Sequence, residues 1–123
     1  MFTPKSIAVV SLWAEDVSQA THFYRDVLKL PALPHHGEQR PHFRIGETIL
    51  TILEGTPAVR QPNDPGYFPA FAIAVDDLDA ALAQLQHHNF PLVGEVVENA
   101  GARYVMLHDP AGNLIELVEF KPA

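Results

Sequence analysis

The sequence predicts an α+β fold made of two copies of one unit, in which a strand and a helix precede two or three further strands. Residues 7–14 and 70–75 are rich in apolar residues, including the β-branched residues that favour strands. Each segment is followed by an aspartate and then by apolar residues at helical spacing, and this pattern returns after roughly 60 residues. We therefore expect two βαβββ modules, each with a curved mixed sheet.

Composition limits the classes of function. The chain has 123 residues, a net charge of −7 and only 8 lysines and arginines, which argues against a nucleic-acid surface. It has no cysteine, which excludes disulfides and thiol nucleophiles. No apolar run reaches membrane-spanning length, and the N-terminus lacks the features of a secretion signal, so a cytoplasmic location without membrane association is expected.

The first module is expected over residues 5–57. Its first strand places Val9, Ser11 and Trp13 on one face and Val10, Leu12 and Ala14 on the other. Asp16 is suited to cap the helix that follows, with Gln19 at the capping-box position, and prolines end it. The two remaining predicted strands are 42–45 and 48–53, joined at Gly46-Glu47.

The second module is expected over residues 68–120, after a linker rich in proline and glycine at 55–66. A strand at 70–75 precedes a helix capped by Asp76-Asp77 and ended by Pro91. Residues 93–97 are strand-like, and Asn99-Ala100-Gly101 forms a turn before the closing hairpin. All of these elements together make one domain over residues 1–123.

The closing hairpin, 104–120, contains the most informative carboxylate. Proline and glycine in Asp109-Pro110-Ala111-Gly112-Asn113 predict a tight turn. Glu116 then stands in an otherwise apolar strand, where a carboxylate is a ligand, an ion-pair partner or a neutral acid. Arg44 and Arg103 are the candidate partners that would give Glu116 a purely structural role.

One helix can cover only one face of each sheet, so the opposite, concave faces are expected to line a common cleft. Three small side chains on that face, Ala70, Ala72 and Ala74, favour a roomy apolar pocket or close packing against a bulky neighbour. The residues expected on the concave side are Val9, Ser11, Trp13, Thr51, Ala70, Ala72, Ala74, Leu114, Glu116 and Val118.

Aromatic and histidine residues offer further candidates. Trp13 suits a stacking platform for a flat or cationic ligand, or a core or dimer contact, whereas packing is favoured for Tyr67 and Tyr104. Adjacent histidines in a polar loop, His35-His36, are more often solvated than metal ligands. The other histidines considered are His42 at a strand start, His87-His88 at a helix end, and His108, which is expected to point outward.

The paired modules, together with LWAEDVSQATHFYRDVLKLP, VDDLDAALAQL and DPAGNLIELVEF, resemble the vicinal-oxygen-chelate superfamily. That superfamily contains glyoxalases, extradiol dioxygenases and bleomycin-resistance proteins. The resemblance covers nearly the whole chain and implies the glyoxalase/bleomycin-resistance fold, with a concave cleft and a homodimer. It does not specify the activity, because one fold supports many chemistries.

The resemblance also implies where metal ligands would stand. The positions are Val9, Thr51, Ala70 and Glu116, of which only Glu116 has a metal-binding side chain. The chain is therefore most similar to the metal-free binding members, and we expect it to bind a small hydrophobic or aromatic molecule without a cofactor. The alternative is a metal-dependent lyase, isomerase or dioxygenase with a shifted ligand set, or an enzyme that uses Glu116 as a catalytic base. The predicted ligand-binding residues are Val9, Ser11, Trp13, Arg44, Thr51, Ala70, Ala72, Arg103, Tyr104 and Glu116.

Overall fold

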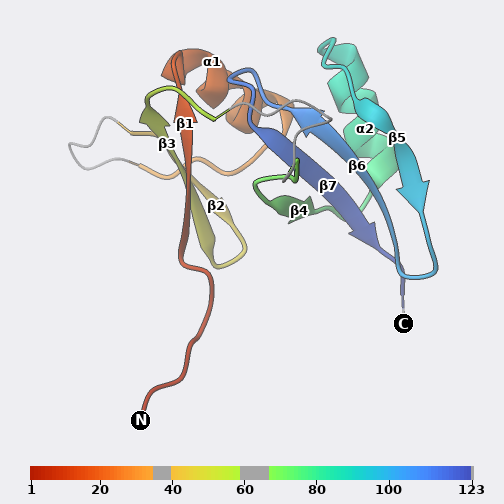
Figure 1. The fold of residues 1–123 in the computed structure, drawn as a ribbon, viewed down its shortest axis with the longest axis horizontal. Helices are drawn as coiled ribbons and strands as arrows, with labels where there is room; N and C mark the ends of the chain where they lie inside the picture. Colours follow the sequence, from red (N-terminus) through yellow and green to blue (C-terminus); the bar gives the residue numbers. More distant parts are fainter. Residues whose placement is uncertain (35–39, 59–66, 123) are drawn as a thin grey trace. The chain divides into compact units, whose positions relative to one another are not determined.

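The computed structural model describes residues 1–34, 40–58 and 67–122, and these form two compact units, 1–57 and 58–123. The predicted linker at 55–66 lies largely outside the described residues, as do His35 and His36. Both units combine strands with one helical segment, so the predicted α+β class is confirmed (Figure 1). Within the described ranges, no helix is long and apolar enough to cross a lipid bilayer.

The first unit contains a sheet of order β1-β3-β2, in which β1 is parallel and β2 antiparallel to β3. Its core is built from the apolar side chains that alternate along β1 and β3 and from the inner side of the helix. The elements are β1 Val9–Ala14, α1 Val17–His22, the π-helical turn η1 Phe23–Val27, β2 His42–Ile45 and β3 Thr48–Glu54. The buried apolar residues are Leu12, Ala14, Ala20, Phe23, Tyr24, Val27, Phe43, Leu50 and Ile52.

The helix of the first unit begins where the sequence predicts it. The Asp16 carboxylate accepts a hydrogen bond from the backbone N–H of Gln19 at 3.0 Å, which satisfies one of the free amides of the first turn. The helix then widens into η1, where the N–H of Leu28 donates to the carbonyl of Phe23 at 2.9 Å. Lys29 adopts a left-handed backbone conformation (φ 62°) and ends the segment just before Pro31.

The first sheet has three strands within the described residues, not four. Ala32 makes only an isolated bridge with Phe43, although the N–H of Leu33 donates to the carbonyl of His42 at 2.9 Å. Pro31 and Pro34 flank this bridge, and proline has no N–H to continue a ladder. The expected βαβββ order is therefore reduced in this unit to βαββ and a single bridge.

The second unit contains a sheet of order β4-β7-β6-β5. Strands β4 and β7 are parallel, and the other neighbours are antiparallel. The elements are β4 Ala72–Ala74, α2 Leu78–His87, β5 Val93–Glu98, β6 Ala102–His108 and β7 Leu114–Phe120. The strand β4 is shorter than the predicted 70–75, but the N–H of Ala70 still donates to the carbonyl of Leu114 at 2.7 Å, so the chain follows β7 beyond it.

Helix α2 lies against β7 and is fixed at its start by two carboxylates. Asp77 accepts from the N–H of Ala80 at 3.0 Å, as the sequence predicts, and Glu119 of β7 accepts from the N–H of Leu78 at 2.8 Å. The second of these bonds joins the helix to the sheet. The buried apolar residues of this unit are Ile73, Leu78, Leu85, Val105, Leu107, Leu114, Ile115, Leu117 and Val118.

The turn of the closing hairpin is organised by Asp109, whose side chain is buried. Its Oδ1 atom accepts from the N–H groups of Ala111 at 3.0 Å and Asn113 at 2.9 Å, and its Oδ2 accepts from the Asn113 side chain at 3.0 Å. Gly112 has φ 98°, a conformation that glycine adopts without a steric penalty. The predicted tight turn is therefore a small hydrogen-bonded cage around one carboxylate.

Candidate functional site

One face of the first sheet, here called the Trp13 face, carries most of the candidates from that unit. Along β1, Val9, Ser11 and Trp13 are exposed whereas Leu12 and Ala14 are buried, as the predicted alternation requires. The residues of β3 and β2 that are paired in register with these positions lie on the same face, because partners in a ladder share a face of the sheet. The Trp13 face comprises Val9, Ser11, Trp13, His42, Arg44, Ile49, Thr51 and Leu53.

Thr51 occupies the middle of the Trp13 face, opposite Ser11 on one side and His42 on the other. Its side chain is buried, and its hydroxyl donates to the backbone carbonyl of Pro41 at 3.1 Å. The hydroxyl hydrogen is therefore already used within the fold. Arg44, in contrast, is exposed at the outer strand β2.

One face of the second sheet, here called the Glu116 face, brings together Ala72, Tyr104 and Glu116 from three strands. Glu116 stands between Ala72 on β4 and Met106 on β6, and the next row contains Ala74, Val118 and Tyr104. Ala72 and Ala74 are exposed, whereas Val118 is buried. The Glu116 face comprises Ala72, Ala74, Tyr104, Met106, His108, Leu114, Glu116 and Val118.

Ala70 lies outside β4 and is also exposed. Its backbone is tied to the Leu114 carbonyl, so it continues the edge beside β7 without being part of a strand. The predicted row of three alanines is thus two strand residues and one residue of the preceding segment.

The Glu116 carboxyl lies in surroundings that disfavour its charge. Partial burial raises its pKa above the ordinary range of a glutamate. Its lateral neighbours, Ala72 and Met106, have no N–H or O–H group in their side chains. Within the described ranges, no hydrogen bond or ion pair joins another residue to this carboxyl, so its oxygens remain available to an outside donor.

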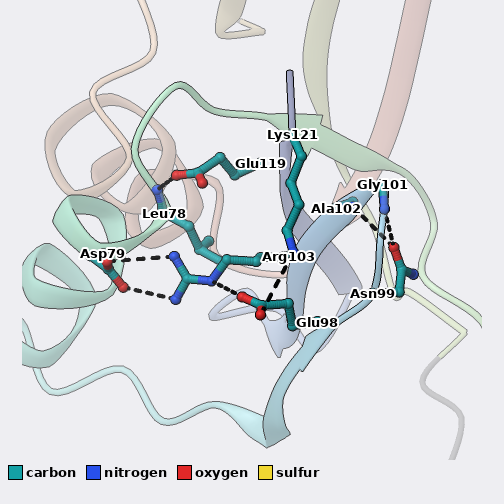
Figure 2. Close-up of polar contacts among 9 residues, drawn as sticks. All are labelled: Leu78, Asp79, Glu98, Asn99, Gly101, Ala102, Arg103, Glu119 and Lys121. Atoms are coloured by element: carbon teal, nitrogen blue, oxygen red, sulfur yellow. Dashed lines mark hydrogen bonds and ion pairs between the residues drawn. The ribbon is translucent and has the colours of Figure 1, made fainter. Parts of the chain in front are cut away.

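Arg103 does not serve as the partner of Glu116. It pairs in register with Glu119, and the alternation of β6 places it on the opposite face from Tyr104. There its guanidinium contacts Asp79 of α2 at 3.0 Å and Glu98 at 3.2 Å, as Figure 2 shows. The hydrogen bonds from Arg103 lower the pKa of Asp79. The structure therefore corrects the expectation that Arg103 lies near the cleft, since its contacts tie α2 to the sheet.

His108 differs from its predicted outward position. It pairs with Leu114, so it shares the Glu116 face, and its Nε2 atom is buried with no hydrogen-bond partner among the described residues. The Tyr67 hydroxyl is buried in the same way, and the two ring centroids are 6.5 Å apart. Strict alternation from Tyr104 through Met106 would have placed His108 on this face, but the adjoining turn obscured the pattern.

A sequence profile of the glyoxalase/bleomycin resistance protein/dioxygenase superfamily matches residues 6–117. The chain belongs to this superfamily. No curated protein sequence matches it.

Solved structures of this superfamily and of related proteins share the fold. A lactoylglutathione lyase from Agrobacterium tumefaciens is 24% identical, with a TM-score of 0.72 over 95% of each chain. A glyoxalase/dioxygenase from Nostoc punctiforme is 18% identical, with a TM-score of 0.82 over 99% of this chain and 97% of that one. An antibiotic-binding protein from a Streptomyces species is 22% identical, with a TM-score of 0.76 over 98% and 100%. At these identities the similarity establishes the fold and not the chemistry.

The metal site of the superfamily's enzymes does not fit the residues of this member. Val9 and Ala70 have no donor atom in their side chains, and the Thr51 hydroxyl is bonded to a backbone carbonyl. Among the residues that the structure describes, no three histidine, aspartate or glutamate side chains form a group that could hold an ion. Glu116 alone supplies too few ligands for a divalent ion, which needs about three from the protein.

Proposed function

We propose that this superfamily member binds a small hydrophobic or aromatic molecule on the Glu116 face, without a metal and without chemistry. The observation that carries the proposal is the Glu116 carboxyl, which is partly buried, disfavoured as an anion and unpartnered within the described ranges. The carboxyl oxygens are still reached by solvent, so a hydrogen bond from a ligand would replace one to water and contribute a modest net free energy of binding.

The surroundings of Glu116 favour an apolar body for the ligand. Ala72 and Ala74 are exposed and small, so a flat molecule can approach the backbone of β4 closely. Met106 and Tyr104 on β6 supply polarisable and aromatic surface beside it. The expected ligand is thus a neutral aromatic molecule that carries one N–H or O–H group.

Indole and N-methylindole form a matched pair of probes for this proposal, because they differ in the single N–H donor. Saturation-transfer NMR should show that both bind, with indole about three- to tenfold tighter, the range expected for one hydrogen bond. The preference should vanish in Glu116→Ala. Equal affinities of the two probes for the unaltered protein would contradict the role of Glu116.

Ala72→Leu tests the apolar part of the site. The larger side chain should fill the space above β4 and weaken indole binding at least about tenfold. Ala83→Leu is the matched control, because Ala83 is exposed on α2, away from this face. Unchanged indole binding in Ala72→Leu would show that the ligand does not bind above β4.

A metal-retention experiment separates this proposal from the metal-enzyme alternative. The purified protein is incubated with Mn²⁺, Fe²⁺, Ni²⁺ or Zn²⁺ and desalted, and the retained metal is measured. Retention well below one equivalent is expected from the poor donor set. Tight, stoichiometric retention would favour a lyase or dioxygenase with a shifted ligand set.

We further propose a homodimer, which the superfamily membership supports. Phe68 and Phe120 are large apolar side chains that are exposed in the single chain, and burial in an interface would stabilise them. Light scattering coupled to gel filtration should give twice the mass of the chain. A monomer at the highest concentration tested would contradict this.

A further inference from the structure

Two buried polar atoms meet at one end of the Glu116 face. The Tyr67 hydroxyl and the Nε2 atom of His108 are both closed to solvent, and neither has a hydrogen-bond partner among the described residues. The two rings are neighbours, with centroids 6.5 Å apart and planes inclined by 53°, but they share no hydrogen bond. Because a buried polar group without a partner is costly, and phenylalanine at either position would avoid that cost, the pair indicates a function.

The register of the second sheet places this pair beside Glu116. On β6, His108 stands two residues beyond the residue that faces Glu116, which makes the two diagonal neighbours on one face. Such neighbours are about 7–8 Å apart in an antiparallel pair of strands. Tyr67 approaches from the segment before β4, which a 2.7 Å hydrogen bond from the N–H of Ala70 to the carbonyl of Leu114 holds beside β7. A bicyclic aromatic ligand on this face can therefore reach both Glu116 and the pair.

The chemistry of the two atoms matches a hydroxyl group. A tyrosine hydroxyl both donates and accepts, and an imidazole nitrogen donates in one tautomer and accepts in the other. A hydroxyl group on a ligand has the same two capacities, so it can donate to one atom and accept from the other. A methyl group of similar size can do neither.

The free energy available at this pair differs from that at Glu116. Solvent reaches the Glu116 carboxyl, so a ligand bond there replaces a bond to water, whereas Tyr67 Oη and His108 Nε2 have no such bond to give up. A ligand hydroxyl enters when the Tyr67 side chain turns, and Tyr67 lies outside every strand and helix. The hydroxyl should therefore contribute more to affinity than the N–H group that faces Glu116.

We propose that the Tyr67 hydroxyl and His108 Nε2 form a second polar subsite on the Glu116 face, which binds the hydroxyl group of a phenol-type aromatic ligand. The inference rests on the proposed function, because it narrows the class of ligand for the same face. The ligand then has a donor group at one end, for Glu116, and a hydroxyl group at the other.

Four indoles test the two ends of the ligand separately. These probes are 5-hydroxyindole, 5-methylindole and the N-methyl derivative of each. Saturation-transfer NMR titrations should show that each hydroxyl compound binds about tenfold tighter than the methyl compound with the same nitrogen. The preference for N–H over N-methyl reports on Glu116, and the preference for hydroxyl over methyl reports on the pair.

Tyr67→Phe removes one hydroxyl and keeps the ring, and His108→Phe removes the imidazole. Each should reduce the hydroxyl preference to about threefold, and the double variant should abolish it, whereas Glu116→Ala should leave it intact. His87→Phe is the matched control, because His87 is exposed at the end of α2. Tyr67→Phe should leave the melting temperature of the free protein unchanged or higher, since its hydroxyl has no bond to lose. A lower melting temperature would assign that hydroxyl a structural partner and contradict the inference.

The outcomes separate this inference from the proposed function. Equal affinities of 5-hydroxyindole and 5-methylindole, or a hydroxyl preference that survives in the double variant, would overturn the subsite. If the N–H preference persists in that case, the proposed role of Glu116 stands. Loss of the N–H preference with the hydroxyl preference intact would count only against Glu116, and absence of binding by all four probes would count against both.

Discussion

The two sheets come from one repeated pattern, yet their outer strands differ. In the second unit, β5 is a full strand beside β6, and Pro91 stands before it. In the first unit, the described part of the corresponding segment makes one bridge, at Ala32, and Pro31 and Pro34 flank it. Proline on both sides of the Ala32 bridge removes N–H groups that could extend the ladder, whereas Pro91 lies before the strand of the second unit.

The charged contacts of the two units differ in a second way. In the first unit, hydrogen bonds from Arg25 and His22 lower the pKa of Asp26 to about 2, but all three residues lie on one helical segment. In the second unit, Arg103 joins β6 to α2 and β5 through Asp79 and Glu98. The ion pairs of Asp26 act within one helical segment, whereas those of Arg103 connect a strand to a helix and to a neighbouring strand.

The two hairpin turns provide the largest expected effect. Asp109→Ala should destabilise the protein by about 2–3 kcal/mol, because it leaves two part-buried backbone N–H groups and the Asn113 side-chain amide without their acceptor. Glu47→Ala, in the exposed turn of the first hairpin, is the control and should change stability by less than about 0.5 kcal/mol. Urea unfolding measures both. Similar effects of the two variants would show that the Asp109 cage contributes little.

Gly46→Ala tests the first hairpin turn directly. Gly46 has φ 58° with open space around it, so alanine is strained by its backbone and not by contacts. The expected destabilisation is about 1 kcal/mol in urea unfolding. Gly101→Ala, without a positive φ, should cost less. The reverse order would contradict the conformational argument.

Two arginine variants test this difference. Arg103→Met removes ion pairs between elements, and Arg25→Met removes an ion pair within one helical segment. Arg103→Met should lower the melting temperature by roughly 2–4 °C, and Arg25→Met should change it less. Pairing lowers the pKa of Asp79, so its stabilising effect is present above the pKa of the unfolded chain and lost as the pH falls through the folded value. Thermal scans should therefore show the difference between unaltered protein and Arg103→Met shrinking in acid. A difference that is independent of pH would assign the effect to packing.

Glu116→Gln gives the smallest expected effect. Burial raises the pKa of Glu116, so ionisation of this carboxyl lowers the free energy of unfolding once the pH exceeds that raised value. Glutamine avoids this cost and should stabilise the protein by up to about 0.5 kcal/mol at pH 7, with the gain lost below the pKa of the unfolded chain. Glu95→Gln, exposed on β5, is the control. Clear destabilisation at pH 7 would point to a partner for the carboxylate.

The sequence by itself determined the repeat, the helix caps at Asp16 and Asp77, both hairpin turns and the alternation that places Trp13 and Glu116 on sheet faces. These features depend on neighbours in the chain, where spacing and capping chemistry act directly. Only the tertiary structure decided that Arg103 contacts Asp79 of α2, that the His108 ring lies beside Tyr67, and that Gly55 lies against the ring of Trp13. Those outcomes depend on strand register and on approach between segments that are distant in sequence, and no local pattern encodes either one.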